Sequence, residues 1–198
     1  MAVIPLRSYV DSSAVPTLVL VDLQQEYVSP PRGLAMQQAE QALEKCREAL
    51  VHARTMGFPV AFVRWLGHSA FFNTSAPFSR WIEGFEPTGG DMIFERDRPS
   101  CFASRQFADV MCGTSNIVIA GFAGEAACLS TMIDGFHRGK RITYLADASA
   151  SHPLGNLDEA DVHNVIGKLA SIYGEIQTTA EWIISTGQTL LTSVWFNG

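Results

Sequence analysis

Apolar and polar positions along the chain fall into blocks that have the lengths of strands and helices. Strand-like apolar runs occupy residues 17–23, 58–65, 92–96, 116–120, 141–146 and 175–178. Between them, apolar residues recur at helical spacing at about 36–56, 103–111, 126–138 and 157–172. Strands that alternate with helices are typical of βαβ units, so the sequence predicts an α/β fold around a parallel sheet of six strands.

One connection departs from this pattern. Residues 66–91 are irregular, and they carry Phe71, Phe72, Phe78, Trp81 and Phe85 among Ser, Thr, Gly and Pro. A connection of this length is usually functional or disordered, and its aromatic content argues against disorder. We interpret it as a lid or pocket wall; an apolar cluster under a loop and an oligomer contact are the alternatives. No linker divides the chain, which predicts one domain over residues 1–198.

Composition narrows the class of protein. A chain of 198 residues with 47% hydrophobic and 17% charged residues can bury a full core. The net charge is −6 and the chain has no dense Lys/Arg cluster, so the sequence shows no basic patch that would bind nucleic acid or an anionic membrane. The four cysteines include no CxxC pair, and the first residues lack the hydrophobic region of a signal peptide. No apolar run approaches the roughly 20 residues that a membrane span needs. These features together predict a cytoplasmic protein. We expect a small-molecule substrate as its partner, with no nucleic acid and no membrane.

The last ten residues, TLLTSVWFNG, are unusually apolar for a terminus. Such a segment docks either on its own domain or on a neighbouring subunit. We expect a homo-oligomer, a dimer or a tetramer.

Side chains capable of chemistry gather where the predicted strands end. In open α/β sheets the ligand site lies at the carboxyl ends of the strands, near the point where strand order reverses. Asp22 ends the first strand, and Cys128 follows the fourth in the first turn of a helix. A helix N-terminus favours an anion, so this thiol should ionise more readily than a core thiol. The other candidates at strand ends are His68, Arg96, Arg98, Asp147 and His152.

Several of these residues also have a purely structural explanation. A carboxylate such as Asp22 can accept backbone N–H groups in a turn, and Cys128 or Cys101 can be packing residues. Glu125, just before Cys128, is most simply a helix cap. An aspartate and a cysteine at adjacent strand ends are together stronger evidence for a catalytic site than either residue alone.

Several pieces of the chain, taken together, resemble the isochorismatase-like cysteine hydrolases, which include nicotinamidases and N-carbamoylsarcosine amidohydrolase. The matching pieces are TLVLVDLQQEYV (17–28), FPVAFVRW (58–65), RPSCF (98–102), GFAGEAACLSTMIDGFHRGKRITYLADASAS (121–151) and the helix with His163 followed by EIQTTAEW. They span residues 17–182, and the block around Cys128 is the most specific. The resemblance implies a three-layer αβα, Rossmann-like fold with strand order 3-2-1-4-5-6.

The resemblance also implies a catalytic site. Asp22 would be the base and Cys128 the nucleophile of an Asp–Lys–Cys triad. Backbone N–H groups of Cys128 and of the preceding loop (Phe122, Ala123 and Gly124) would form an oxyanion hole beside a cis peptide at Phe122–Ala123 or Ala123–Gly124. The implied reaction is hydrolysis of a C–N bond in a small amide, carbamoyl or ureide substrate through a cysteine thioester.

The sequence departs from the family at the lysine. That residue normally lies shortly before the segment that is Ser100-Cys101-Phe102 here, where this chain has only Arg96 and Arg98. Arg96 fits the commonest spacing, and Arg98 fits if the loop is shorter. Arginine keeps the positive charge but does not release a proton at neutral pH. We expect its guanidinium to lower the pKa of Asp22, and we expect a standing thiolate–arginine pair or a slow enzyme.

Other features complete the expected site. The Asp-x-His pair of the nicotinamidase metal site is missing from MQQAEQALEK (36–45), so we predict no catalytic metal and no cofactor. The residues expected to contact substrate are Trp65, His68, Phe71, Phe72, Trp81, Arg98 and Cys101, and the aromatic ones suggest an apolar ligand.

Three alternative functions remain open. One is a cysteine–histidine hydrolase that uses His68 or His152 as its base. Another is a nucleotide-binding domain built on GFAGEA, although this segment lacks the GxGxxG pattern. The third is a non-catalytic member of the same fold that has lost the lysine and acts in small-ligand binding or assembly.

Overall fold

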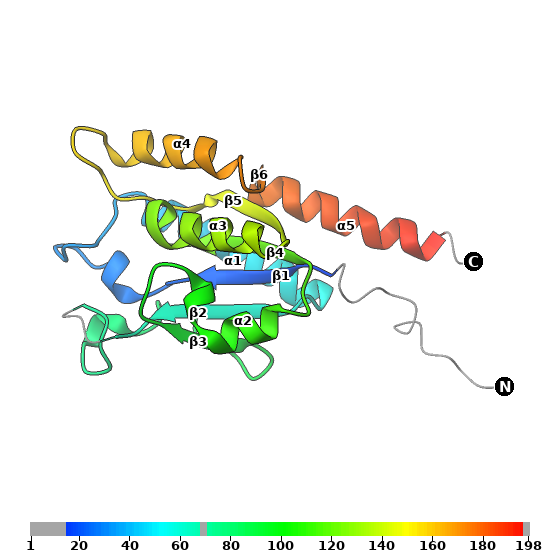
Figure 1. Ribbon diagram of the computed structural model, residues 1–198, viewed down its shortest axis with the longest axis horizontal. Coiled ribbons are helices and arrows are strands. Elements are labelled where there is room, and N and C mark those ends of the chain that lie inside the picture. The colour runs from blue at the N-terminus through cyan, green and yellow to red at the C-terminus, as the bar shows by residue number, and fades with distance from the viewer. Residues whose placement is uncertain (1–14, 68–70, 196–198) are drawn as a thin grey trace.

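A computed structural model describes residues 15–67 and 71–195, with side chains described up to residue 187 (Figure 1). Six parallel strands form one sheet in the order β3-β2-β1-β4-β5-β6. They are β1 (Thr17–Val21), β2 (Val60–Trp65), β3 (Met92–Arg96), β4 (Asn116–Gly121), β5 (Arg141–Ser149) and β6 (Glu175–Gln177). The predicted fold class and strand order are therefore confirmed.

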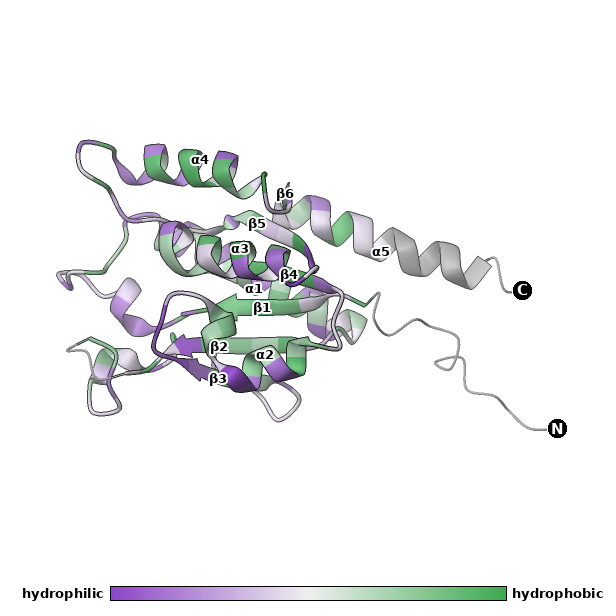
Figure 2. Cartoon of the chain, viewed as in Figure 1, coloured by the Kyte–Doolittle hydropathy of each residue, from purple (hydrophilic) through white to green (hydrophobic). Residues whose placement is uncertain are grey.

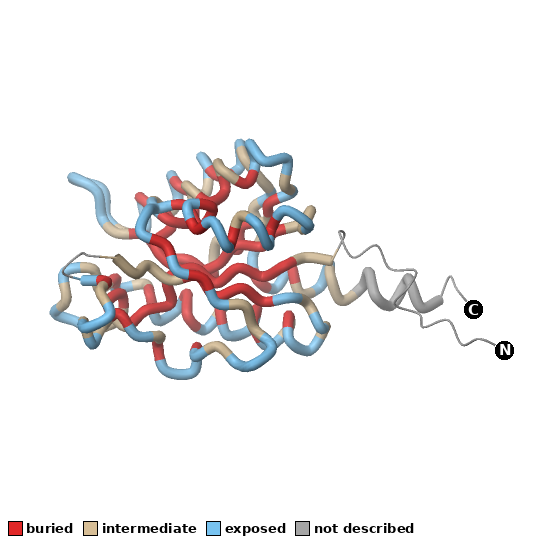
Figure 3. The backbone as a smooth tube through the Cα atoms, turned by 60° about the horizontal axis from the view of Figure 1, so that its bottom comes forward, coloured by how far each residue is buried: buried red, intermediate tan, exposed pale blue. Residues whose placement is uncertain are grey.

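Helices cover both faces of the sheet. Helices α1 (Ala39–Met56) and α5 (Thr179–Trp195) lie on one face, and α2 (Arg105–Met111), α3 (Leu129–His137) and α4 (Glu159–Ala170) lie on the other. Successive side chains of β1 alternate between them: Leu18 and Leu20 pack toward α1, whereas Val19 and Val21 pack toward α2 and α3. Apolar colour in Figure 2 and burial in Figure 3 both concentrate on the central strands. Burial on both faces explains why these strands lack a polar side.

The long helix α1 follows the predicted amphipathic pattern. Its buried positions, among them Ala42, Cys46 and Ala53, recur at spacings of three and four, and Gly57 ends the helix in the left-handed conformation (φ 69°). Cys46 is a packing residue whose Sγ donates to the Ala148 carbonyl at 3.1 Å.

The helix α5 was not predicted from the sequence, and several other elements begin or end two or three residues from their predicted bounds. Three differences lie near the candidate site. Strand β1 ends at Val21 because Asp22 turns into the left-handed region (φ 50°), which aspartate tolerates better than most residues. Strand β5 continues to Ser149, so Asp147 lies within it and accepts from the Thr179 backbone N–H at 2.7 Å. A π-helical turn over Gly124–Cys128 precedes α3, where an ordinary helix start was expected.

The aromatic connection packs into the core at the edge of the sheet to which the strands point. In Figure 1 residues 22–38 and the first part of the connection lie at this edge, and the connection returns to the opposite edge before β3 begins at Met92. Phe72, Ile82 and Phe85 are buried in the cluster beneath α1. The segment is therefore a structured wall beside the strand ends.

Two of the predictions concern residues or side chains that the structure does not describe. His68 lies outside the described residues, and so do the side chains of the apolar C-terminal segment. Within residues 15–67 and 71–195, no helix has the length and apolar character needed to cross a membrane.

Candidate active site

The ends of β1 and β4 meet at very close range. The N–H of Phe122 donates to the Val21 carbonyl at 2.8 Å. Gly121 has φ 114°, and a Cβ there would lie 2.1 Å from the Val21 carbonyl oxygen, so only glycine fits. The Phe122–Ala123 peptide is cis, at one of the two positions that the resemblance implied. This approach sets Asp22 beside the turn that carries Cys128.

Asp22 and Arg96 form a buried ion pair. Both side chains are almost fully buried, and Arg96 Nη2 donates to Asp22 Oδ2. Arg96 Nη1 donates to the Arg98 carbonyl at 2.5 Å, and its guanidinium carbon lies 4.8 Å from the centre of the Trp65 ring. The Arg98 side chain is exposed. Arg96, and not Arg98, is therefore the arginine that pairs with Asp22.

Burial dominates the titration of Asp22. It raises the pKa of this carboxyl from an ordinary value of 3.8 to about 6, while the Arg96 charge pulls the pKa down. The guanidinium lowers the pKa of Asp22, as expected, but the pair is fully buried and desolvation outweighs this effect, so the pKa lies above its ordinary value. A carboxyl with a pKa near 6 is a better match for general-base work at neutral pH.

Cys128 is fully buried. Its side chain has no solvent exposure, and its Sγ donates to the Gly121 carbonyl at 3.5 Å. Burial raises the pKa of the thiol well above its ordinary value, so the predicted easier ionisation and the standing thiolate are wrong. The π-helical turn explains part of this, because the Cys128 N–H donates to the Ala123 carbonyl at 3.2 Å. An incoming oxyanion would have to replace that weak bond to use this N–H.

Two polar residues near Asp22 were not singled out from the sequence. Tyr27 is buried, its ring centre lies 5.5 Å from that of Phe72, and a hydrogen bond from its hydroxyl lowers the pKa of Asp22. Gln24 is fully buried, and its amide binds the Trp65 backbone and the Ser79 carbonyl. Gln24 thus ties the end of β2 to the aromatic connection. The only signal in the sequence was their closeness to Asp22 in VDLQQEY.

The comparisons with known proteins agree with this geometry. Residues 16–181 match the family model described as the isochorismatase domain. The chain belongs to the isochorismatase family. This assignment fits the sheet order and the placement of Asp22, Arg96 and Cys128 at one edge of the sheet.

Relatives of known name fall within this family. A ureidoacrylate amidohydrolase from Azorhizobium caulinodans is 24% identical, over 90% of this chain and 92% of the relative. The structure of an isochorismatase from Pseudomonas putida KT2440 is 25% identical with a TM-score of 0.78, over 86% of this chain and 90% of the other. That of N-carbamoylsarcosine amidase from Thermoplasma acidophilum is 19% identical with a TM-score of 0.68, over 83% and 96% of the two chains. The last likeness shows the fold alone.

The residues of this isochorismatase-family chain that were expected to contact substrate differ in how close they lie to the Asp22–Arg96 pair. Trp65 lies under the Arg96 guanidinium, and Phe72 packs between Trp65 and Tyr27. Phe71 is partly exposed, and the guanidinium carbon of Arg32 lies 5.8 Å from its ring centre. Trp81 packs edge-on against Phe62 in the core cluster beneath α1. Trp65 and Phe72 are thus the candidates beside the Asp22–Arg96 pair.

Cys101 is a buried neighbour of the charged pair. Its N–H donates to Thr131 Oγ1 at 3.0 Å, one turn beyond Cys128. Burial raises the pKa of its thiol to about 11, while the charge of Arg96 lowers it. A neutral thiol in this position packs against the site.

Glu125 and His152 pair with each other. Glu125 makes no helix cap; its carboxylate lies 2.7 Å from His152 Nδ1, and His152 Nε2 lies 3.0 Å from the Leu34 carbonyl. Both ring nitrogens face acceptors, an arrangement that favours the imidazolium, and the hydrogen bond to Glu125 raises the pKa of His152. A charged histidine has no lone pair for a base, which argues against His152 in the cysteine–histidine alternative.

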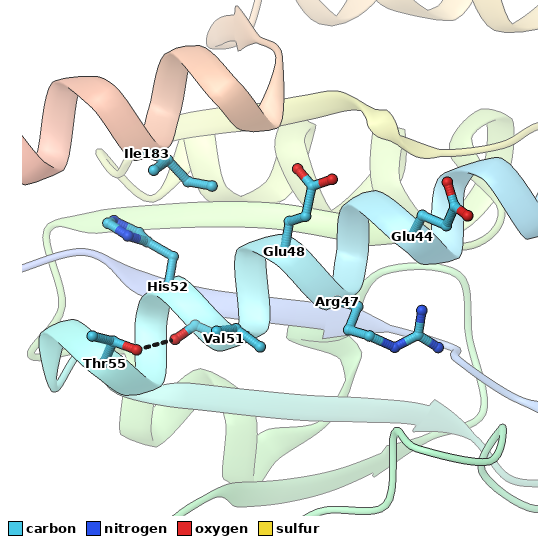
Figure 4. Close-up of a pocket in the computed structure, with 7 residues that line it drawn as sticks. All are labelled: Glu44, Arg47, Glu48, Val51, His52, Thr55 and Ile183. Carbon is cyan, nitrogen blue, oxygen red and sulfur yellow. Dashed lines mark hydrogen bonds between the residues drawn. The ribbon is translucent and has the colours of Figure 1, made fainter.

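A separate groove lies on the outer side of α1, next to α5 (Figure 4). Glu44, Arg47, Glu48, Val51, His52, Thr55 and Ile183 line it, and no residue of the Asp22–Arg96–Cys128 group is among them. Among the described residues, no group of three or more His, Cys, Asp or Glu side chains could hold a metal ion.

Proposed function

We propose that this isochorismatase-family chain is a hydrolase that cleaves a C–N bond of a small amide, carbamoyl or ureide substrate, with Cys128 as the nucleophile. One observation carries the proposal: the buried Asp22–Arg96 ion pair lies at the same strand edge as Cys128. The relative named as a ureidoacrylate amidohydrolase supports the substrate class.

The first half of the reaction forms a thioester. Asp22 accepts the proton of the Cys128 thiol while the sulfur attacks the substrate carbonyl carbon, so that a C–S bond forms and negative charge moves to the carbonyl oxygen. The N–H groups of Phe122 and Gly124 already donate to the Val21 and Ala150 carbonyls at 2.8 Å each. The Cys128 N–H, released from its 3.2 Å bond to the Ala123 carbonyl, therefore stabilises that oxyanion. The intermediate collapses, the C–N bond breaks, and Asp22 returns the proton to the departing nitrogen.

The second half hydrolyses the thioester. A water molecule gives one proton to Asp22 as its oxygen attacks the acyl carbon. The C–S bond then breaks, and the proton on Asp22 returns to sulfur. A carboxyl with a pKa of about 6 can both take and give this proton near neutral pH.

Arg96 supports this cycle without exchanging a proton. A guanidinium stays charged throughout, and here it is fixed by the Arg98 carbonyl and the face of Trp65. It holds the Asp22 carboxylate in place and offsets part of the cost of burying it. This arrangement implies a neutral thiol that ionises only as it attacks.

A second candidate function is small-ligand binding or assembly without turnover. The full burial of the Cys128 sulfur favours it, because a substrate carbonyl must reach that atom. Entry would require the aromatic wall or the segment that carries Tyr27 to move.

The two functions are separated by assaying ammonia release from a panel of small amides, carbamoyl compounds and ureides. We expect release by the parent protein and by Cys112→Ala, since Cys112 is exposed, and none by Cys128→Ala. Release that persists in Cys128→Ala would contradict the thioester. An inactive parent in which a panel compound protects Cys128 from alkylation would support the binding function.

A further inference from the structure

The Cys128 sulfur has a hydroxyl neighbour that the proposed mechanism does not use. Ser149, the last residue of β5, is buried, and its Oγ lies 3.9 Å from Cys128 Sγ. Its hydroxyl donates to the Gly121 carbonyl at 2.7 Å, and the same carbonyl accepts the Cys128 thiol at 3.5 Å. In the resting state the hydroxyl and the thiol therefore share one acceptor.

Loss of the thiol proton changes the hydrogen bonds that the Cys128 sulfur can make. A thiolate can only accept hydrogen bonds, and it would face the oxygen of the Gly121 carbonyl, which is also an acceptor. Rotation about the Cβ–Oγ bond of Ser149 turns its hydrogen from that carbonyl to the sulfur without moving a heavy atom. Hydrogen bonds to ionised groups are roughly twice as strong as neutral ones, so this rotation favours the thiolate.

Arg96 is less well placed for this task. Its Nη2 donates to Asp22 and its Nη1 to the Arg98 carbonyl, and its Nε has no hydrogen-bond partner among the described residues, so none of its nitrogens is bonded to the Cys128 sulfur. Burial raises the pKa of Cys128, the negative charge of Asp22 raises it further, and the hydrogen bond from Ser149 lowers it. A thiolate here thus depends on the hydroxyl more than on the cation.

The hydroxyl of Tyr144 lies close to Ser149, and both border Gly124. Tyr144 lies on the same strand, is fully buried, and has a phenol oxygen without a hydrogen-bond partner among the described residues. Both hydroxyls border Gly124, where a Cβ would lie 2.9 Å from Tyr144 Oη and 3.3 Å from Ser149 Oγ. The Ser149 oxygen can accept a hydrogen bond whichever way its own hydrogen points, so it can accept from Tyr144 while it donates to the sulfur.

The geometry points to Ser149 as a catalytic residue that donates its hydroxyl hydrogen to the Cys128 thiolate during attack, with Tyr144 as a positioning residue behind it. The inference rests on the proposed role of Cys128 as nucleophile. No group is transferred in this step: the thiol proton goes to Asp22, and the Ser149 hydrogen stays on its own oxygen.

The test is the pH dependence of Cys128 alkylation by iodoacetamide, measured by mass spectrometry of the peptide that carries Cys128. The charged and titratable groups that act on this thiol are Asp22, Tyr27, Arg96, Cys101, Glu125 and Tyr144. All six are unchanged in the Ser149 variants, so a shift of the midpoint reports on the hydroxyl.

We expect Ser149→Ala to raise the alkylation midpoint by about one pH unit, the equivalent of one hydrogen bond to a charged group. Ser149→Thr should keep the midpoint of the parent, and Ser149→Val, which has the size of threonine without the hydroxyl, should shift it as alanine does. Tyr144→Phe should shift it less, in the same direction. Ser151→Ala is the matched control, because Ser151 also borders Gly124 but pairs with His163 at 3.1 Å.

An unchanged midpoint in Ser149→Ala would overturn the inference, even if hydrolysis fell, since that pattern shows a structural role. If the Thr and Val variants do not fold, the comparison of Ser149→Ala with Ser151→Ala decides. Alkylation needs no substrate. A shifted midpoint in a protein that hydrolyses nothing would therefore contradict the proposed function while leaving the hydroxyl's action on the thiolate established.

Discussion

Replacing Asp22 by asparagine should remove a pH-dependent loss of stability. Burial raises the pKa of Asp22 from 3.8 to about 6, so between these values the folded protein holds a proton that the unfolded chain has released. Stability from a group of this kind is present below the lower value and is lost as the pH rises through the higher one. The difference between 3.8 and about 6, at about 1.36 kcal/mol per pH unit, corresponds to roughly 3 kcal/mol.

The assay is urea unfolding followed by tryptophan fluorescence, for the parent and for Asp22→Asn, across the range from acid to neutral pH. The free energy of unfolding of the parent minus that of the variant should fall by roughly 3 kcal/mol between acid and neutral pH. Subtraction cancels groups that titrate alike in both proteins. The unpaired Arg96 left in the variant adds a constant offset, because a guanidinium does not titrate in this range.

Asp91→Asn supplies a control of opposite sign. Hydrogen bonds from Arg54 and Thr88 lower the pKa of Asp91, so its contribution to stability is present at neutral pH and is lost as the pH falls. The same difference for Asp91 should therefore rise with pH. A flat or rising curve for Asp22 would refute the conclusion that burial outweighs the Arg96 charge.

Three further substitutions test other parts of the site. Arg96→Lys keeps the cation and adds a group that can release a proton, so the rate of ammonia release should stay level or rise; complete loss would show a dedicated role for the guanidinium. Gly124→Ala would place a Cβ 2.7 Å from Ser151 Oγ and 2.9 Å from Tyr144 Oη, and should lower the free energy of unfolding in urea by about 1–3 kcal/mol; an unchanged value would contradict this packing. Glu125→Gln should lower the pKa of His152 in an imidazole NMR titration, and an unmoved titration would show that the ion pair is absent in solution.

Much of the fold could be predicted from the sequence, because hydrophobic periodicity reports burial directly. The apolar run of β1 and the stripe of α1 that contains Cys46 follow from elementary spacing rules. The strand order came from the resemblance to a family, since no local pattern says which strands pair. The end of β5 was placed too early because Asp147, which is depleted from strands as a residue type, pairs with Thr179 and stays within the strand.

The candidate site was predicted in part. Strand ends and the family motif indicated Asp22, Arg96 and Cys128 as partners, and the structure brings Asp22 and Arg96 into contact. The charge states could not be predicted, because they depend on how deeply the groups are buried. Ser149 and Tyr144 were not singled out, since isolated hydroxyl residues in a strand have no distinctive pattern and gain a role only through their neighbours.

The central claim is that the Cys128 sulfur carries the acyl group during turnover. It is tested most directly by rapid acid quench of the protein with an amide that it hydrolyses, followed by mass spectrometry of the proteolytic fragments. The account predicts a transient acyl adduct on the fragment that contains Cys128, and none on the fragments with Cys46, Cys101 or Cys112. Steady hydrolysis without an adduct at Cys128, or with the adduct on another residue, would contradict it.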